Sequence, residues 1–195
     1  MGPAKTIVLS QALSQQQIAD IDAWLWTFAV SIDSPVKPGN WFFFVTDLTM
    51  LHLASVEKPC AFGLVVVDPM SEMEENEAER IMIELGSWPR SGLNIWAGCK
   101  GHIDHLTLAH ILLQMMERYA GWLDVDREDS YHKFEYEMEQ SMHGQERTEK
   151  RQSIPGEKRK IVYWDSYLHE WQETILIDAN RFHSWLRHPD FYFMK

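Results

Sequence analysis

Cysteine, positive charge and long apolar runs are all scarce in this chain of 195 residues. Its two cysteines, Cys60 and Cys99, each lie in or beside an apolar run, as buried thiols of a reducing compartment do. A disulfide-rich secreted scaffold is therefore excluded. No stretch approaches the roughly 20 apolar residues that span a bilayer, and the N-terminal residues lack a secretory pattern. We expect a cytoplasmic protein.

The charge is strongly unbalanced, because 29 acidic residues against 18 Lys and Arg give a formal net charge of -11. Phosphate groups would be repelled, so we expect neither nucleic acid nor an anionic membrane as a partner. The same charge would speed the approach of a basic protein. It would also serve solubility alone, and composition does not separate these two interpretations.

Motifs that identify a reaction are missing. The sequence contains no GxSxG, GxxxxGK, HExxH or CxxC motif, and no spacing marks a catalytic pair among its many carboxylates. Cys99, in GCKG, follows an apolar run and precedes a helix start, where a thiolate can be activated. Packing as a small buried residue explains the same position more simply.

Three histidines and an aspartate fall close together in HIDHLTLAH. An α-helix turns about 100° per residue, which puts His105 in line with Ala109 on the buried stripe and His110 on the polar face. Those two side chains point apart and do not share a metal ion. Asp104 stands where a first-turn acid belongs, and the direction of His102 is open. We expect no metal site and no cofactor.

Hydrophobic periodicity predicts an α+β fold. Aromatic and β-branched runs predict strands at 6–10, 41–46, 61–68, 93–99, 122–125, 160–168 and 173–179. Helical spacing predicts helices at 14–29, 71–86 and 103–120 and a short one after Asp178. Ser14 with Gln17 and Ser71 with Glu74 form capping-box patterns. We expect a single domain over residues 1–195, with about four helices packed on a mixed or mainly antiparallel sheet.

The segment 126–160 differs from the rest in composition. It has six acids and two bases from Asp126 to Glu139, then three acids and six bases from Glu146 to Lys160. This predicts a charged, exposed insertion within the domain, partly helical or mobile, whose two halves pair with each other. After it, Phe182, Trp185 and Leu186 have the spacing of a buried helical stripe.

Aromatic residues are numerous, with nine Trp and nine Phe, and most should lie in the core. Trp88 in GSWPRSG and Trp171 in LHEWQE stand in polar, loop-like surroundings and are candidates for an exposed protein interface. The run SEMEENEAE offers a dense negative surface to the same partner, although such a run is usually a solvated helix face. Its candidate residues are Glu72, Glu74, Glu75, Glu77 and Glu79.

Two stretches carry a family resemblance: NIWAGCKGHIDHLTLAHILLQMMERYAGWLDV and the C-terminal ILIDANRFHSWLRHPDFYFMK. They resemble a family of small bacterial proteins with a DAxFxxWLxHPxFxxxK ending, similar to immunity proteins of polymorphic-toxin and type VI secretion systems. Ala120-Gly121 departs slightly from the two glycines of that pattern. The matching residues are Asp104, His105, Gly121, Asp124, Asp178, Phe182, Trp185, Leu186, His188, Pro189, Phe191 and Lys195.

The resemblance implies no catalytic residues. It implies a protein that binds a cognate toxin and blocks its active site. The acidic charge of the chain favours a basic toxin, such as a nuclease. A competing interpretation is a small hydrolase or transferase that uses Cys99, His102 or His105, and a third is a structural adaptor.

Overall fold

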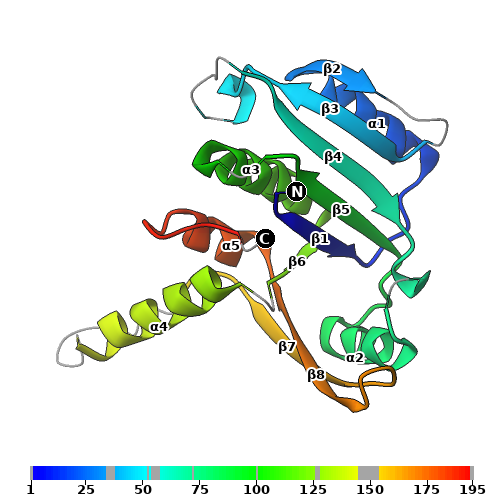
Figure 1. Cartoon of the computed structure of the whole chain (residues 1–195). Coiled ribbons are helices and arrows are strands. Elements are labelled where there is room, and N and C mark those ends of the chain that lie inside the picture. The colour runs from blue at the N-terminus through cyan, green and yellow to red at the C-terminus, as the bar shows by residue number, and fades with distance from the viewer. Residues whose placement is uncertain are drawn as a thin grey trace.

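All strand pairings in the described part of the chain are antiparallel. The computed structural model describes residues 2–33, 38–51, 53, 58–71, 73–99, 101–125, 128–144 and 154–193. Eight strands in these residues form one sheet in the order β2-β3-β4-β5-β1-β6-β8-β7 (Figure 1). With five α-helices in the same residues, the fold class is α+β, as predicted. No helix in these ranges combines the length and apolar character that crossing a membrane requires.

The elements alternate irregularly along the chain. The strands are β1 (Ala4–Leu9), β2 (Ala29–Asp33), β3 (Asn40–Val45), β4 (Cys60–Val67), β5 (Ser91–Ala97), β6 (Trp122–Asp124), β7 (Lys158–Asp165) and β8 (Glu170–Ile177). The α-helices are α1 (Gln15–Leu25), α2 (Glu75–Leu85), α3 (His102–Tyr119), α4 (Asp129–Gly144) and α5 (Ala179–Leu186). Two short 3-10 helices are η1 (Thr49–Leu51) and η2 (Pro69–Ser71).

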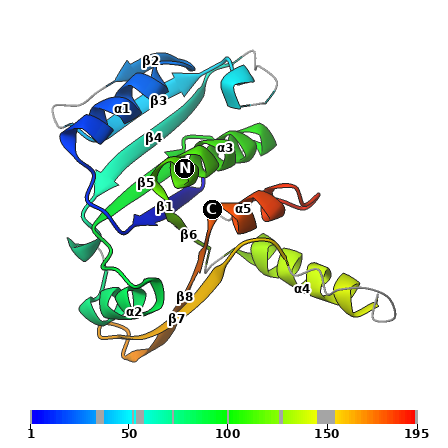
Figure 2. The same cartoon turned by 180° about the vertical axis from the view of Figure 1, so that it is seen from behind.

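The two faces of the sheet are covered unequally (Figures 1 and 2). α1, α3, α5 and the start of α4 pack on one face and enclose the main core. α2 packs on the other face over β1, β6, β8 and β7, where Ile81 meets Val8, Ile161 and Leu176 in a smaller apolar cluster. Because side chains alternate along a strand, the register assigns each strand residue to one of these two faces.

Three helix starts follow local sequence chemistry. The predicted capping box of α1 is present, since Ser14 Oγ accepts from Gln17 N at 3.2 Å and Gln17 Oε1 accepts from Ser14 N at 2.9 Å. At α3, Asp104 Oδ2 accepts from Gly101 N at 2.7 Å, which is the first-turn role predicted for this acid. The predicted cap of α5 is also confirmed, because Asp178 Oδ1 accepts from Arg181 N at 2.8 Å.

Two predicted helix boundaries are wrong, the end of the first helix and the start of the second. The first helix ends at Leu25 instead of residue 29, and Ala29–Asp33 form strand β2, which the sequence pattern missed. Phe28 has the spacing of the helical stripe, but it is buried from the turn that follows α1. Ser71 does not cap α2, because its Oγ donates to Asp68 O within a 3-10 turn, and the helix begins only at Glu75.

The end of α3 explains the small residues at its C-terminus. Ala120 is the capping residue and has a left-handed backbone with φ of 50°. A Cβ at Gly121 would lie 2.3 Å from Cγ2 of Ile7. Gly121 is therefore required by the close approach of α3 to β1.

The charged segment 126–160 is less exposed than its composition predicts. It forms α4, whose Tyr131 and Phe134 are buried in the main core, and Ile154 is buried as well. Glu128, which precedes α4, is also buried and forms an ion pair with Lys5 of β1. The prediction of an exposed insertion is therefore wrong for these residues, because the apolar side chains of one helical face outweigh the charges around them. Residues 126–127 and 145–153 lie outside the described residues.

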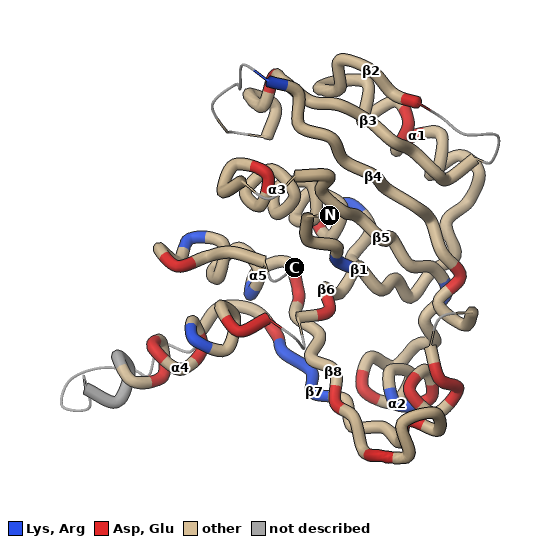
Figure 3. Tube along the Cα trace, viewed as in Figure 1, with Lys and Arg blue, Asp and Glu red and all other residues tan. Residues whose placement is uncertain are grey.

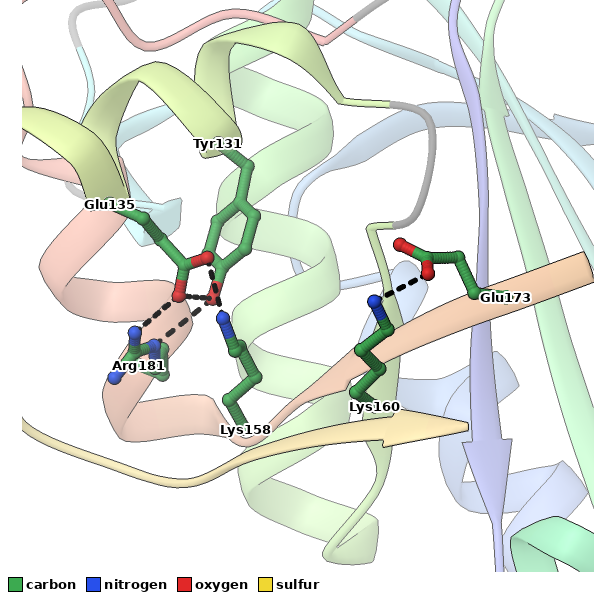
Figure 4. A network of polar contacts seen from close by, with 6 residues as sticks. All are labelled: Tyr131, Glu135, Lys158, Lys160, Glu173 and Arg181. Atoms are coloured by element: carbon green, nitrogen blue, oxygen red, sulfur yellow. Dashed lines mark hydrogen bonds and ion pairs between the residues drawn. The ribbon is translucent and has the colours of Figure 1, made fainter. Parts of the chain in front are cut away.

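A network of polar contacts joins α4 to α5 and to β7 (Figure 4). Tyr131 OH donates to Glu135 Oε1 at 2.8 Å, and Arg181 Nε donates to Tyr131 OH at 3.0 Å. Glu135 also pairs with Arg181 and, at 2.7 Å, with Lys158. The Glu135–Lys158 pair is one case of the predicted pairing between the two charged halves of 126–160.

The C-terminal ending forms an aromatic cluster. Phe182 and Trp185 of α5 are fully buried, and Phe191 and Phe193 dock beside them as an irregular tail. Tyr131 meets the Trp185 ring edge-on at a centroid distance of 5.3 Å. The predicted buried stripe is confirmed for Phe182 and Trp185, while Leu186 is only partly buried.

Replacing Trp185 with Ala should therefore lower the free energy of unfolding by about 3–5 kcal/mol, because it empties a large buried aromatic site. The matched control is Trp26→Ala, since Trp26 is 54 % exposed, and the change there should stay within about 0.5 kcal/mol. Denaturant unfolding followed by circular dichroism measures both. Equal stability of the two variants would contradict the assignment of Trp185 to the core.

Candidate protein-binding surface

The hairpin formed by β7 and β8 extends beyond the helices that cover the rest of the sheet (Figure 1). Ile175 and Ile177 of β8 reach the main core, whereas the other end of the hairpin is exposed. At that end, the exposed fraction is 87 % for Tyr167 and 64 % for Trp171, and Leu168 is exposed too. Large exposed apolar residues gathered in one place are typical of binding sites.

One side of this hairpin is aromatic. Trp164 and Trp171 face each other across the two strands in register, and their rings meet edge-to-face with centroids 5.6 Å apart. Val162, two residues before Trp164, is exposed on the same side. Because each tryptophan ring contacts the other, both are held in place before any partner arrives, which lowers the entropic cost of binding.

The other side of the hairpin lies against α2, a helix rich in acidic residues (Figure 3). Asn76 Nδ2 donates to Trp164 O at 2.7 Å, and Ser166 Oγ donates to the Glu74 carboxylate at 2.9 Å. These two contacts fix the N-terminal end of α2 to the hairpin. Glu75 and Glu79 of α2 remain exposed. The acidic helix and Trp171, which are far apart in sequence, therefore belong to one structural unit.

Glu77 is the member of the acidic run that turns toward the sheet. It lines a polar pocket of about 260 Å³ together with Lys5, Asp124, Tyr163 and other residues of β1 and β8. Burial, together with the neighbouring carboxylates of Asp124 and Asp165, raises the pKa of Glu77 to about 7. Glu77 is consequently only partly ionised at neutral pH.

The predicted interface residues lie in different surroundings. Glu75, Glu79 and Trp171 are exposed around the hairpin, Glu74 contacts Ser166, and Glu77 faces the pocket. Glu72 lies outside the described residues. Trp88 is half-buried and lines a different hollow, of about 440 Å³, with Ala12, Asp68, Met70, Pro89 and Arg90.

Sequence reasoning missed Trp164, Tyr167 and Leu168 as surface residues. YWDSYLHEW contains the signal, since DSYLHE has turn-forming residues between two aromatic strand ends. The prediction wrongly assigned this turn to the strand at 160–168. The observed turn begins at Asp165, whose Oδ1 accepts from the backbone N of Tyr167 at 2.9 Å and of Leu168 at 2.7 Å.

The histidines and cysteines of the competing enzyme interpretation have separate surroundings. His105 is buried and its Nδ1 accepts from Phe193 N at 3.1 Å, which ties the C-terminal tail to α3. Cys99 is exposed, so the prediction that it packs as a buried residue is wrong, and His102 is exposed as well. Cys60 is buried, and burial together with Asp104 raises the pKa of its thiol to about 12, so it stays protonated.

His110 lies away from His105, as helix geometry predicts. It lines an open groove of about 760 Å³ between α3 and α5. The lining includes the apolar residues Leu113 and Leu186 and the basic residues Arg118 and Arg187. The groove places two arginines at one site on a chain whose net charge is -11.

Glu137, His188 and Asp190 bring three potential metal-ligand atoms within 4.8 Å of one another. The Lys133 ammonium lies 2.5 Å from Asp190 Oδ2 and 3.7 Å from Glu137 Oε1. His188 Nδ1 accepts from Asp190 N, so Nε2 carries the proton and points at Glu137, 3.0 Å away. In this arrangement the carboxylates of Glu137 and Asp190 hold the ammonium group of Lys133, and a metal ion would have to displace it.

The chain belongs to a family of unknown function, DUF6368, whose model matches residues 1–195. No curated protein and no solved structure shows significant similarity to the chain. The family assignment therefore supplies neither a reaction nor a partner. Only the exposed surface of the chain points to a function.

The position of Glu77 generates a pH prediction. A carboxyl whose pKa rises on folding stabilises the folded state at low pH, and this contribution is lost as pH rises through about 7. Glu77→Gln, which is neutral throughout, should lose less thermal stability than the parent between about pH 5 and pH 8. The exposed neighbour offers a matched control, Glu79→Gln, which should follow the parent. Circular dichroism across a pH series gives the melting temperature of each variant. Parallel curves of melting temperature against pH for Glu77→Gln and the parent would contradict the prediction.

Proposed function

We propose that this member of the DUF6368 family is an immunity protein, which binds a cognate antibacterial toxin in the cytoplasm and neutralises it by covering its active site. The observation that carries the proposal is the exposed end of the β7–β8 hairpin. It presents the Trp164–Trp171 pair on one side and the acidic helix α2 on the other.

The shape of this element suits occlusion. A protruding element enters a cleft more readily than a flat surface does. The aromatic side of the hairpin and the exposed face of α2 then contact opposite walls of the cleft. Trp, Tyr and Arg dominate the binding energy of protein interfaces, and three such aromatic residues, Trp164, Tyr167 and Trp171, are exposed on this hairpin. Their fixed arrangement favours a partner with a preformed cleft, such as the active site of an enzyme.

The charge of the surface favours a basic partner. Glu75 and Glu79 are exposed on α2, and Asp165 and Glu170 lie on the hairpin side that faces this helix. In a chain with net charge -11, these groups attract a basic toxin and accelerate its association. Toxins that act on nucleic acid carry basic substrate channels, so a nuclease fits this surface well.

The C-terminal resemblance to immunity proteins supports the proposal through the fold. The pattern residues Asp178, Phe182, Trp185 and Phe191 cap α5 or fill the core beside it, and they are not part of the exposed hairpin. A shared ending of this kind preserves a scaffold while the binding surface varies. The enzyme alternative has less support, because His105 is engaged by the C-terminal tail while Cys99 and His102 are exposed.

Removal of one tryptophan tests the aromatic side. Trp171→Ala should weaken binding to the toxin encoded beside this gene by about tenfold or more, as loss of an interface anchor usually does. The matched control is Trp26→Ala, because Trp26 is also exposed and caps α1, a helix at the opposite end of the molecule from the hairpin (Figure 1). Titration calorimetry measures both affinities. Unchanged affinity for Trp171→Ala, or equal losses in both variants, would remove the hairpin from the interface.

Charge reversal tests the acidic side. The double variant Glu75→Lys/Glu79→Lys should slow association with the toxin several-fold at low salt, with a smaller change in dissociation, because exposed charges act mainly on the encounter rate. The effect should shrink as salt is added. Surface plasmon resonance across a salt series provides both rates. An association rate that the reversals leave unchanged at every salt concentration would exclude α2 from the encounter surface.

A further inference from the structure

The two cysteines of the chain, far apart in the sequence, lie opposite each other at one end of the β4–β5 pair. Cys60 is the first residue of β4, and Cys99 follows shortly after the last residue of β5. The antiparallel register pairs Phe62 with Ala97. The hydrogen bond from Gly98 N to the carbonyl oxygen of residue 61, at 2.6 Å, continues this pairing by one residue. Cys60 and Cys99 are the next opposing residues in the same register.

The backbone hydrogen bonds define the geometry of this opposing pair. Gly98 directs its N–H toward β4, where Ala61 O accepts it. Hydrogen-bonded and non-hydrogen-bonded pairs alternate along two antiparallel strands, so Cys60 and Cys99 form a non-hydrogen-bonded pair. In such pairs the Cα atoms are about 4.5 Å apart and both side chains stand on the same face of the sheet. This separation lies within the Cα distances of about 4.4–6.8 Å that disulfides span.

The surroundings of the two thiols differ. Cys60 belongs to the main core and is 7 % exposed, whereas Cys99 is exposed. Burial, together with the neighbouring Asp104 and Cys99, raises the pKa of the Cys60 thiol to about 12. Cys99 is therefore near enough to act on the Cys60 thiol. A dissolved reagent meets Cys99 first, and it reaches Cys60 only through Cys99.

We propose that Cys60 and Cys99 are a site of reversible oxidation, at which a small-molecule disulfide such as oxidised glutathione converts the two thiols into a cross-strand disulfide. The Cys99 thiolate attacks one sulfur of oxidised glutathione, forms a mixed disulfide and releases one glutathione thiolate. The Cys60 sulfur then attacks the Cys99 sulfur, and the second glutathione thiolate leaves. The protons of the two protein thiols pass to the two glutathione thiolates, so two thiols are oxidised while one disulfide is reduced. The reaction involves neither the β7–β8 hairpin nor the toxin.

Intact mass spectrometry of the full folded chain, incubated with oxidised glutathione and then alkylated, tests the proposal. The parent should lose two hydrogen atoms in mass and take up no alkylating reagent. Dithiothreitol should restore two thiols that can be alkylated after unfolding. Because the chain has only two cysteines, a disulfide within one chain has only this connectivity.

Two variants separate the steps. Cys60→Ser should stop at the mixed disulfide, so its mass should rise by one bound glutathione at Cys99. Cys99→Ser should keep the mass of the unmodified chain, because Cys60 is buried. Circular dichroism verifies folding, and Cys60→Ala decides if Cys60→Ser does not fold.

Three results for the parent would each overturn the proposal: two thiols that remain free for alkylation, a mixed disulfide at Cys99 as the end product, or a disulfide between two chains at double the mass. Glutathione bound to Cys60 in the folded Cys99→Ser variant would also overturn it, because Cys60 would then react without Cys99.

Discussion

The carboxylate of Glu135 is the group on which the placement of the β7–β8 hairpin depends. It receives Arg181 from α5 and Lys158, the first residue of β7, so three elements distant in sequence meet at one largely buried acid. Burial alone would raise the pKa of Glu135, but hydrogen bonds from Lys158, Tyr131 and Arg181 outweigh burial and hold it below its usual value. Removing one partner from such a group costs about 3–5 kcal/mol, so the start of the hairpin is firmly anchored while its far end is free to bind.

The proposed binding surface uses the acidic charge of the chain. The hairpin and α2 combine exposed aromatic rings with carboxylates, which is suited to a partner of opposite charge.

The C-terminal ending shows how a distinctive sequence pattern can be structural. Trp185 is surrounded by Tyr131, Phe182, Phe191 and Phe193, and His105 of α3 accepts the backbone N–H of Phe193. These contacts close the core between α3, α4 and α5. The residues of this C-terminal pattern therefore specify the scaffold, and the exposed hairpin is built on it.

Local chemistry in the sequence determined the α+β class, the capping of α1 and α5, and the burial of Phe182 and Trp185, because caps and apolar periodicity act over a few residues. Tertiary structure alone decided that Tyr131 and Phe134 are buried in the core although they belong to a charged segment. It also decided that Phe28 is buried although it lies outside a helix. It also decided that Trp171 meets Trp164 beside α2, and that Glu77 turns away from Glu75 and Glu79 toward Asp124. The reason is that pairing between distant strands sets these neighbours, and a single sequence carries no local signal for which distant residues will meet.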